Sequence, residues 1–176
     1  MDSLVLAGDA DLAEVAALVN SAYRGDTARQ GWTHEADYLD GERTNEATLR
    51  ADLAAKPDAR LLLLRDGHAL IGCVWLEPAR DGAWYLGMLT VRPDTQARQL
   101  GRTLLAGAED MARRAGVRRM RMTVVSRRDT LIAWYQRRGY HLTAEVHPFP
   151  YGDTRFGTPL RDDLTFVVLD KLLALP

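Results

Sequence analysis

Residues 91–105 decide the fold of this chain, and they read VRPDTQARQLGRTLL. An apolar strand ends at Pro93, a short polar turn follows, and a long amphipathic helix begins near Gln99. The first N–H groups of a helix have no intrahelical partners and carry the positive end of the helix dipole. With Arg98 and Arg102 beside them, these groups predict an anion site. An ordinary strand-to-helix turn is the alternative interpretation.

The segments on either side predict a strand, a crossover helix and a second strand. In residues 99–115, Leu100, Leu104 and Ala108 lie on one apolar stripe. Residues 117–125 alternate between apolar and polar side chains, which is typical of a half-buried strand. Because such crossovers connect parallel strands, we expect 83–91 and 117–125 to lie parallel.

The N-terminal half predicts a strand at 3–7, two helices and an antiparallel meander. Asp9 offers a cap for a helix that ends near Tyr23, and Thr44 or Asn45 caps a second helix. Asp66-Gly67 and Asp81-Gly82 are typical hairpin turns. The strands that these turns connect are expected at 61–64, 68–76 and 83–91.

The remaining segments complete one α/β domain over residues 1–176. We expect a helix at 129–138, a strand near 140–146 and a final strand at 164–169. Residues 147–163 are rich in proline, glycine and aromatic residues, and they predict a long ordered loop.

Composition excludes several function classes. The chain has 176 residues, with 23 Lys plus Arg against 24 Asp plus Glu, so its overall charge argues against a dedicated nucleic-acid binder. Twelve arginines nevertheless fall between residues 92 and 138, which suits a polyanionic ligand, although most are expected on solvated faces. The four histidines and Cys73 have no metal-ligand spacing. With no apolar run of membrane-spanning length, no signal-like N-terminus and a lone cysteine, we expect a cytoplasmic protein without metal, nucleic-acid or membrane partners.

Two motifs resemble the GNAT superfamily of N-acetyltransferases. Gln96 and Gly101 match the first and last conserved positions of its Gln/Arg-x-x-Gly-x-Gly/Ala loop, whereas Ala97 and Gln99 replace glycines. The later stretch 131–140, LIAWYQRRGY, resembles the superfamily pattern Ala-x-x-Phe-Tyr-x-x-x-Gly-Phe. A backbone cradle still functions with Ala97 and Gln99 unless the backbone there needs a positive φ or the ligand crowds the Cα atom.

The resemblance implies a mixed central sheet, flanked by helices, with an antiparallel N-terminal meander and two splayed parallel strands. It further implies transfer of an acetyl group from acetyl-coenzyme A to a primary amine of a small molecule, an amino acid or a protein, by direct attack in a ternary complex. A non-catalytic acyl-coenzyme A sensor or scaffold is the alternative. The residues expected to bind the cofactor are Leu89, Thr90, Val91, Gln96, Ala97, Arg98, Gln99, Leu100, Gly101, Arg102, Thr103, Arg128 and Tyr135.

The resemblance also assigns catalytic roles. Tyr135 matches the tyrosine that protonates the departing thiolate in the superfamily. An amine with a lysine-like pKa is neutral in about one molecule in a thousand at pH 7, which is a handicap of roughly 4 kcal/mol. The candidates for the base that removes its proton are Glu35, Glu77 and His34, and a chain of water molecules is the alternative.

Aromatic and polar residues on two loops are candidates for contact with the acceptor. Residues 29–37, RQGWTHEAD, and 148–152, PFPYG, resemble a bacterial subgroup of the superfamily. We expect Trp32, His34, Glu35, Phe149 and Tyr151 to contact the acceptor amine. Core packing of these side chains, or a homodimer interface at the second loop, is the alternative.

Overall fold

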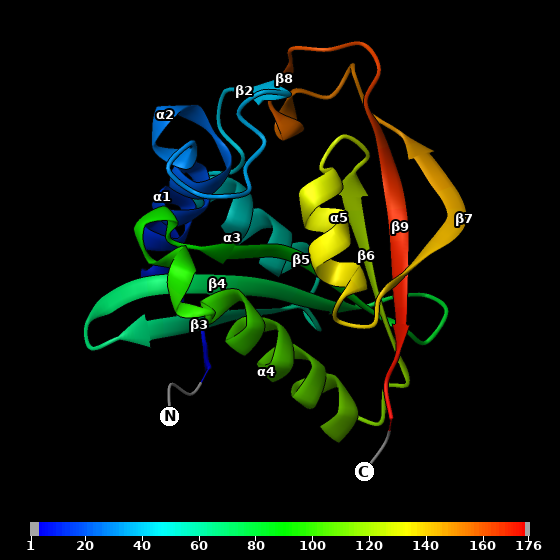
Figure 1. Ribbon diagram of the computed structural model, residues 1–176. Coiled ribbons are helices and arrows are strands. Elements are labelled where there is room, and N and C mark those ends of the chain that lie inside the picture. Colours follow the sequence, from blue (N-terminus) through cyan, green and yellow to red (C-terminus); the bar gives the residue numbers. More distant parts are fainter. Residues whose placement is uncertain (1–3, 175–176) are drawn as a thin grey trace.

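The computed structural model describes residues 4–174, and the side chains of Gln96, Ala97 and Phe156 lie outside this description. A seven-stranded sheet forms the centre of the molecule, with the strand order β1-β3-β4-β5-β6-β9-β7 (Figure 1). The strands are β1 (Val5–Leu6), β3 (Arg60–Asp66), β4 (Ala69–Pro78), β5 (Trp84–Val91), β6 (Arg119–Val125), β7 (His141–Pro148) and β9 (Thr165–Leu172).

The predicted meander and the predicted parallel pair are both confirmed. β3, β4 and β5 are antiparallel neighbours, and the turns between them place Gly67 and Gly82 at φ +60° and +78°. β5 and β6 are parallel, but they pair only at Trp84 with Met120 and at Tyr85 with Arg121 among the described residues. Beyond these pairs the two strands separate widely (Figure 1).

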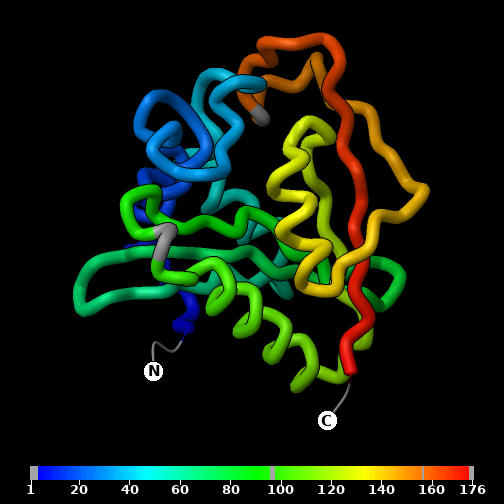
Figure 2. The backbone as a smooth tube through the Cα atoms, viewed as in Figure 1, coloured from blue at the N-terminus to red at the C-terminus, as the bar shows by residue number. Residues whose placement is uncertain are grey.

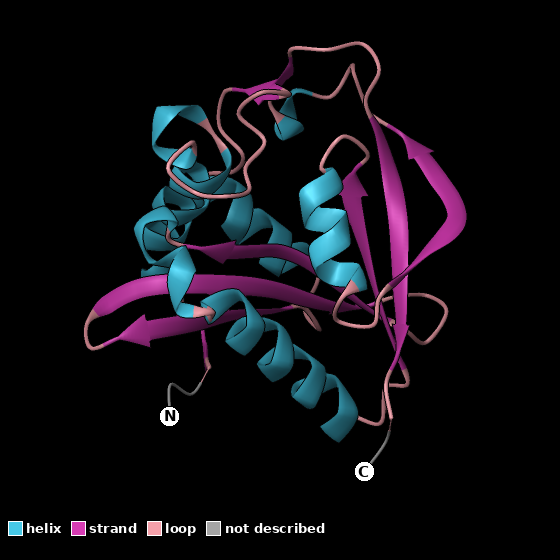
Figure 3. Cartoon of the chain, in the orientation of Figure 1, coloured by secondary structure: helices cyan, strands magenta, loops and turns pink. Residues whose placement is uncertain are grey.

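Helices cover both faces of the sheet (Figure 3). On one face lie α1 (Leu12–Tyr23) and α3 (Glu46–Ala55), which pack Val15, Val19 and Leu49 against β3 and β4. On the other face lie α4 (Leu100–Arg114) and α5 (Asp129–Gln136). The stripe of α4 with Leu104 and Ala108 is fully buried there, as its spacing predicts.

The two predicted N-caps have different outcomes. The side chain of Asn45 accepts a hydrogen bond of 2.8 Å from the N–H of Thr48 and caps α3. Asp9 does not cap α1; instead it begins a short 3₁₀ helix, η1 (Asp9–Asp11), and its carboxylate pairs with Arg50. The 3₁₀ turn moves the start of α1 to Leu12.

Two connecting segments, of which only residues 147–163 were predicted to be a loop, contain short elements. Residues 24–44 form α2 (Gly25–Ala28) and β2 (Leu39–Asp40), and residues 147–163 form η3 (Thr154–Phe156) and β8 (Thr158–Pro159). β2 and β8 pair antiparallel, which brings the two segments together above the gap between β5 and β6 (Figure 2). Among residues 4–174, no helix has the length and apolar character that a membrane crossing requires.

Candidate active site

Two cavities meet where β5 and β6 separate. The first, of about 230 Å³, lies between β5 and the starts of α4 and α5. The second, of about 330 Å³, extends between the two strands toward α1 and the β2–β8 segments. Tyr23, Leu89, Arg128 and Leu131 line both cavities, so the two cavities are direct neighbours.

The outer half of β5 lines the first cavity with Leu89, Thr90 and Val91, and their binding of a cofactor stays a prediction. The N–H of Arg92 donates to the carbonyl of Ile71 on β4 at 2.9 Å. Because strand N–H groups alternate in direction, those of Val91 and Leu89 face the gap instead. A bulge at Met88, whose φ is +51°, bends the strand immediately before this segment.

The start of α4 forms the second wall of this cavity. A 3₁₀ helix, η2 (Pro93–Arg98), precedes it, and Gln99 then adopts a left-handed conformation with φ +59°. No described side chain caps the first turn of α4. The N–H groups of Arg102 and Thr103 donate to the carbonyl of Gln99, so a ligand here would be bound by the N–H groups that precede them in the helix. A Cβ atom on Gly101 would lie 3.4 Å from the ring of Trp134, so a larger residue would crowd the cavity.

The other residues of this loop that were predicted to bind the cofactor differ in burial and in their contacts. Arg98 is exposed and its guanidinium lies 2.9 Å from Asp66. Leu100 is buried in the core, and Thr103 is exposed on α4. The side chains of Gln96 and Ala97 lie outside the described part of the structure, so their predicted contacts stay predictions.

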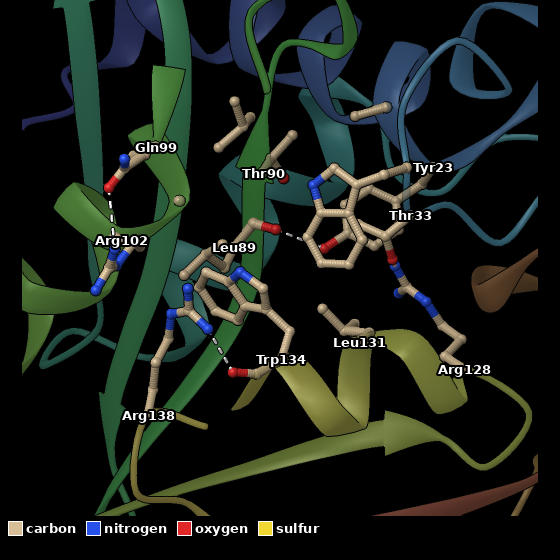
Figure 4. A pocket seen from close by; sticks show the side chains of 14 residues that line it. Tyr23, Thr33, Leu89, Thr90, Gln99, Arg102, Arg128, Leu131, Trp134 and Arg138 are labelled. Atoms are coloured by element: carbon tan, nitrogen blue, oxygen red, sulfur yellow. Dashed lines mark hydrogen bonds between the residues drawn. The ribbon is translucent and has the colours of Figure 1, made fainter. Parts of the chain in front are cut away.

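Two arginines give the first cavity a cationic end (Figure 4). Arg102 donates to the side-chain oxygen of Gln99 at 3.0 Å. Arg138 stacks on Trp134 at 3.7 Å and donates to its carbonyl oxygen at 2.7 Å. The Nε atom of Arg138 is buried without a hydrogen-bond partner among the described residues. Burial, together with the neighbouring Arg102 and Arg137, lowers the pKa of Arg138, so an anion would relieve both effects.

The charged side chains around the first cavity therefore favour the binding of a polyanion. No Asp or Glu is among its described lining residues. Most other arginines of the 92–138 stretch are on solvated or paired faces, as expected. The ion pairs join Arg92 to Asp94, Arg98 to Asp66, Arg113 to Glu109, Arg119 to Asp81, Arg121 to Asp170 and Arg127 to Asp163.

Tyr135 lies on α5 and lines the second cavity. Its side chain is buried between the rings of Trp134 and Tyr140, and no described group forms a hydrogen bond with its hydroxyl. Burial raises the pKa of Tyr135, and the nearby Tyr23 raises it further. The hydroxyl therefore stays protonated at neutral pH and can donate a hydrogen bond.

Glu35 also lies at the second cavity, but its carboxylate is held between two buried arginines. Arg24 donates to it at 2.6 Å and Arg128 at 3.0 Å. Burial alone would raise the pKa of Glu35, but Arg128, Arg24 and Arg43 together lower it below its ordinary value. A carboxylate that is ionised and doubly paired fixes its loop in place, and this geometry favours a structural role over that of a base.

The two other candidate bases line neither of these cavities. Glu77 accepts hydrogen bonds from Lys56 at 2.9 Å and from the indole of Trp75 at 2.7 Å. His34 accepts one from the N–H of Ala36 at 3.2 Å, and burial lowers its pKa.

The predicted acceptor-contact residues separate into three groups. Phe149 is buried in the wall of the second cavity. Trp32 lines the first cavity instead, where its ring lies 6.2 Å from that of Trp134. Tyr151 packs on Phe149, and its hydroxyl accepts from the N–H of Leu164, but it lines neither cavity.

Several lining residues were not singled out in the sequence. Tyr23 donates its hydroxyl to the carbonyl of Leu89 at 2.9 Å, and the guanidiniums of Arg43 and Arg128 lie over its ring. Arg138 and Arg43 carry no local pattern that distinguishes them from surface arginines. No group of three or more potential metal ligands occurs among the described residues.

Comparison with known families gives one match over most of the chain. A sequence model of the acetyltransferase (GNAT) family matches residues 15–140. A protein of Azospirillum brasilense named IAA acetyltransferase is 34% identical over 100 residues. That alignment covers 56% of this chain and 63% of the relative, so the chain spans less than two thirds of the relative's length.

Solved structures share the fold at low sequence identity. The ribosomal-protein-S18-alanine N-acetyltransferase from Escherichia coli is 18% identical, with a TM-score of 0.71 and coverage of 100% of this chain and 96% of that one. A putative acetyltransferase, yncA of Salmonella typhimurium, solved with acetyl-CoA, is 20% identical, with a TM-score of 0.69 and coverage of 98% and 94%.

Proposed function

Because this chain belongs to the acetyltransferase (GNAT) family, we propose that it is an acyltransferase that moves an acetyl group from acetyl-coenzyme A to a primary amine. The chain would act as one acetyltransferase domain. The observation that carries the proposal is the pair of neighbouring cavities that share Leu89. The first is lined by arginines and by the start of α4, and the second has Tyr135 in its wall.

The residues of the first cavity fit coenzyme A. Its diphosphate would be held by the N–H groups at the start of α4, together with Arg102 and Arg138. The uncapped helix turn and the buried, unpartnered Nε of Arg138 both support this assignment. The backbone N–H of Leu89 would pair with the pantetheine arm of coenzyme A, which would lie beside β5 like an added strand.

Acetyl-coenzyme A supplies an activated carbonyl: a bond forms from the amine nitrogen to the acetyl carbon, the C–S bond breaks, and the sulfur takes one proton. In the chain, the N–H of Leu89 would stabilise negative charge at the carbonyl oxygen. The Tyr135 hydroxyl, in the wall of the second cavity, would donate the proton and regain one from solvent. Because the two cavities meet, direct attack in a ternary complex requires no covalent enzyme intermediate.

Removal of the amine proton is assigned to water rather than to one carboxylate. Of the three candidate bases, Glu35 is committed to two arginines, and Glu77 and His34 lie away from both cavities. Water that fills the second cavity would connect the amine to solvent.

Tyr135→Phe tests this function. The variant keeps the ring packing and loses only a hydroxyl without a described partner, so its fold and coenzyme A affinity should be unchanged. We expect acetyl-coenzyme A-dependent thiol release, measured over a panel of amines, to fall by about 10²-fold or more. Tyr140→Phe is the matched control, since that hydroxyl bonds to buried Glu109 and affects stability instead. Equal turnover in Tyr135→Phe and wild type would remove Tyr135 from the mechanism.

A further inference from the structure

The second cavity carries more positive than negative charge. Three arginines line it, Arg24, Arg43 and Arg128, together with one carboxylate, Glu35. Glu35 is shared by Arg24 and Arg128. The guanidinium of Arg43 has no hydrogen bond or ion pair with any described residue, and lies over the ring of Tyr23 with its Cζ 5.8 Å from the centroid. Arg43 is therefore available to a ligand.

The fork of an arginine matches the planar oxygens of a carboxylate and the oxygens of a phosphate group. Building on the proposed acetyl transfer, we propose that the acceptor is a small amine that also carries an anionic oxygen group, which Arg43 binds. An amino acid is the simplest molecule of this class, and an amine with a phosphate group is the other.

The position of Tyr23 limits the size of this acceptor. The guanidinium of Arg43 lies over the ring of Tyr23, and the Tyr23 hydroxyl donates to the carbonyl of Leu89, which lines both cavities. An anionic group bound by Arg43 and an attacking nitrogen beside Leu89 would therefore both lie around one residue, Tyr23. This arrangement suits a compact amino acid rather than the end of a lysine side chain on a protein.

The rest of the wall indicates an apolar body for the acceptor. Leu39, Val125, Phe149 and Phe166 all line the second cavity and pack together in one cluster. A hydrophobic side chain bound there would bury apolar surface, which stabilises a complex in proportion to the area removed from water.

The same charge balance explains how a site without a free carboxylate accepts an amine. Nearby positive charge disfavours the ammonium form and lowers the pKa of a bound amine. The anionic group of the acceptor offsets the repulsion on entry because it binds Arg43. The acceptor then reaches its neutral, nucleophilic form through water.

Binding of product analogues tests the proposal without requiring turnover. N-acetylphenylalanine and its neutral amide form one pair of probes; N-acetylphosphoethanolamine and N-acetylethanolamine form the second. Each is titrated calorimetrically into the full chain, with and without coenzyme A. The proteins are wild type, Arg43→Gln, Arg43→Lys and the control Arg50→Gln, which removes an exposed arginine on α3. Thermal unfolding confirms that each variant is folded.

We expect wild type to bind the anionic member of one pair about tenfold or more tighter than its neutral partner. Arg43→Gln should remove this preference, Arg43→Lys should retain part of it, and Arg50→Gln should leave it intact. The pair that shows the preference identifies a carboxylate or a phosphate. Equal binding within both pairs, or a preference that survives in Arg43→Gln, would overturn the proposal. An Arg43-dependent preference in a protein that neither binds coenzyme A nor transfers acetyl groups would instead overturn the proposed function alone.

Discussion

The Arg128 guanidinium donates to the Glu35 carboxylate at 3.0 Å, across 93 residues of sequence. This contact joins the residue before α5 to the loop after α2, and Arg128 also donates to Thr33 of that loop at 2.8 Å. Trp32 and Thr33 both line the first cavity. The ion pair therefore holds one wall of the proposed donor site to the helix that carries Tyr135.

Glu35→Gln should destabilise the protein by about 3–5 kcal/mol at pH 7, because it leaves two buried arginines without their counter-charge. Chemical denaturation measures this loss. Glu77→Gln, which breaks a more exposed pair with Lys56, should cost about 1 kcal/mol or less. A stable Glu35→Gln variant whose rate loses a pH-dependent step would instead identify Glu35 as the base.

The same pair predicts how stability depends on pH. The pKa of Glu35 in the folded protein lies below its ordinary value, so its contribution is complete above that ordinary value. The contribution is lost as the pH falls through the lower folded pKa. Wild type should therefore lose more stability on acidification than Glu35→Gln does.

Gly101→Glu should abolish coenzyme A binding. The new side chain would begin against the ring of Trp134 and place a negative charge where the diphosphate is expected. Ala106→Glu, on an exposed turn of the same helix, is the matched control. An unchanged dissociation constant for Gly101→Glu, measured by calorimetry, would move the diphosphate elsewhere.

Arg138→Gln should weaken coenzyme A binding by about tenfold or more, since a hydrogen bond to a charged group contributes about 1.5–3 kcal/mol. The loss should shrink as salt is added, because screening already weakens the wild-type interaction. Arg137→Gln removes the exposed neighbouring charge and should have a smaller effect. Equal losses in the two variants would indicate a general effect of charge rather than the stacked geometry of Arg138.

The regular elements were predictable because their patterns are local. The apolar stripe of α4, the Asp-Gly turns and the alternation near Met122 each depend on residues close together in the sequence, and all three are confirmed. The strand order was not predictable beyond the meander and the parallel pair, since β9 lies between β6 and β7 through contacts far apart in sequence.

Individual site residues were harder to predict for the same reason. The motif located the start of α4, and Gln99 does adopt the positive φ at which a glycine is favoured. Arg43, Arg138 and Tyr23 reach the cavities from three separate segments, and no spacing in the chain connects them. Burial and ion pairing, which give Glu35 its environment, are properties of the folded chain alone.

The short contact between β5 and β6 also has a mechanical consequence. Two residue pairs join β5 to β6 among the described residues. The sheet therefore consists of two parts, β1-β3-β4-β5 and β6-β9-β7, that are connected over a short length. An extended ligand that binds between the unpaired parts of β5 and β6 would connect the two parts of the sheet. The stiffness of the whole sheet would then depend on whether a ligand is bound at its centre. Binding would affect the sheet as far as its outermost strands.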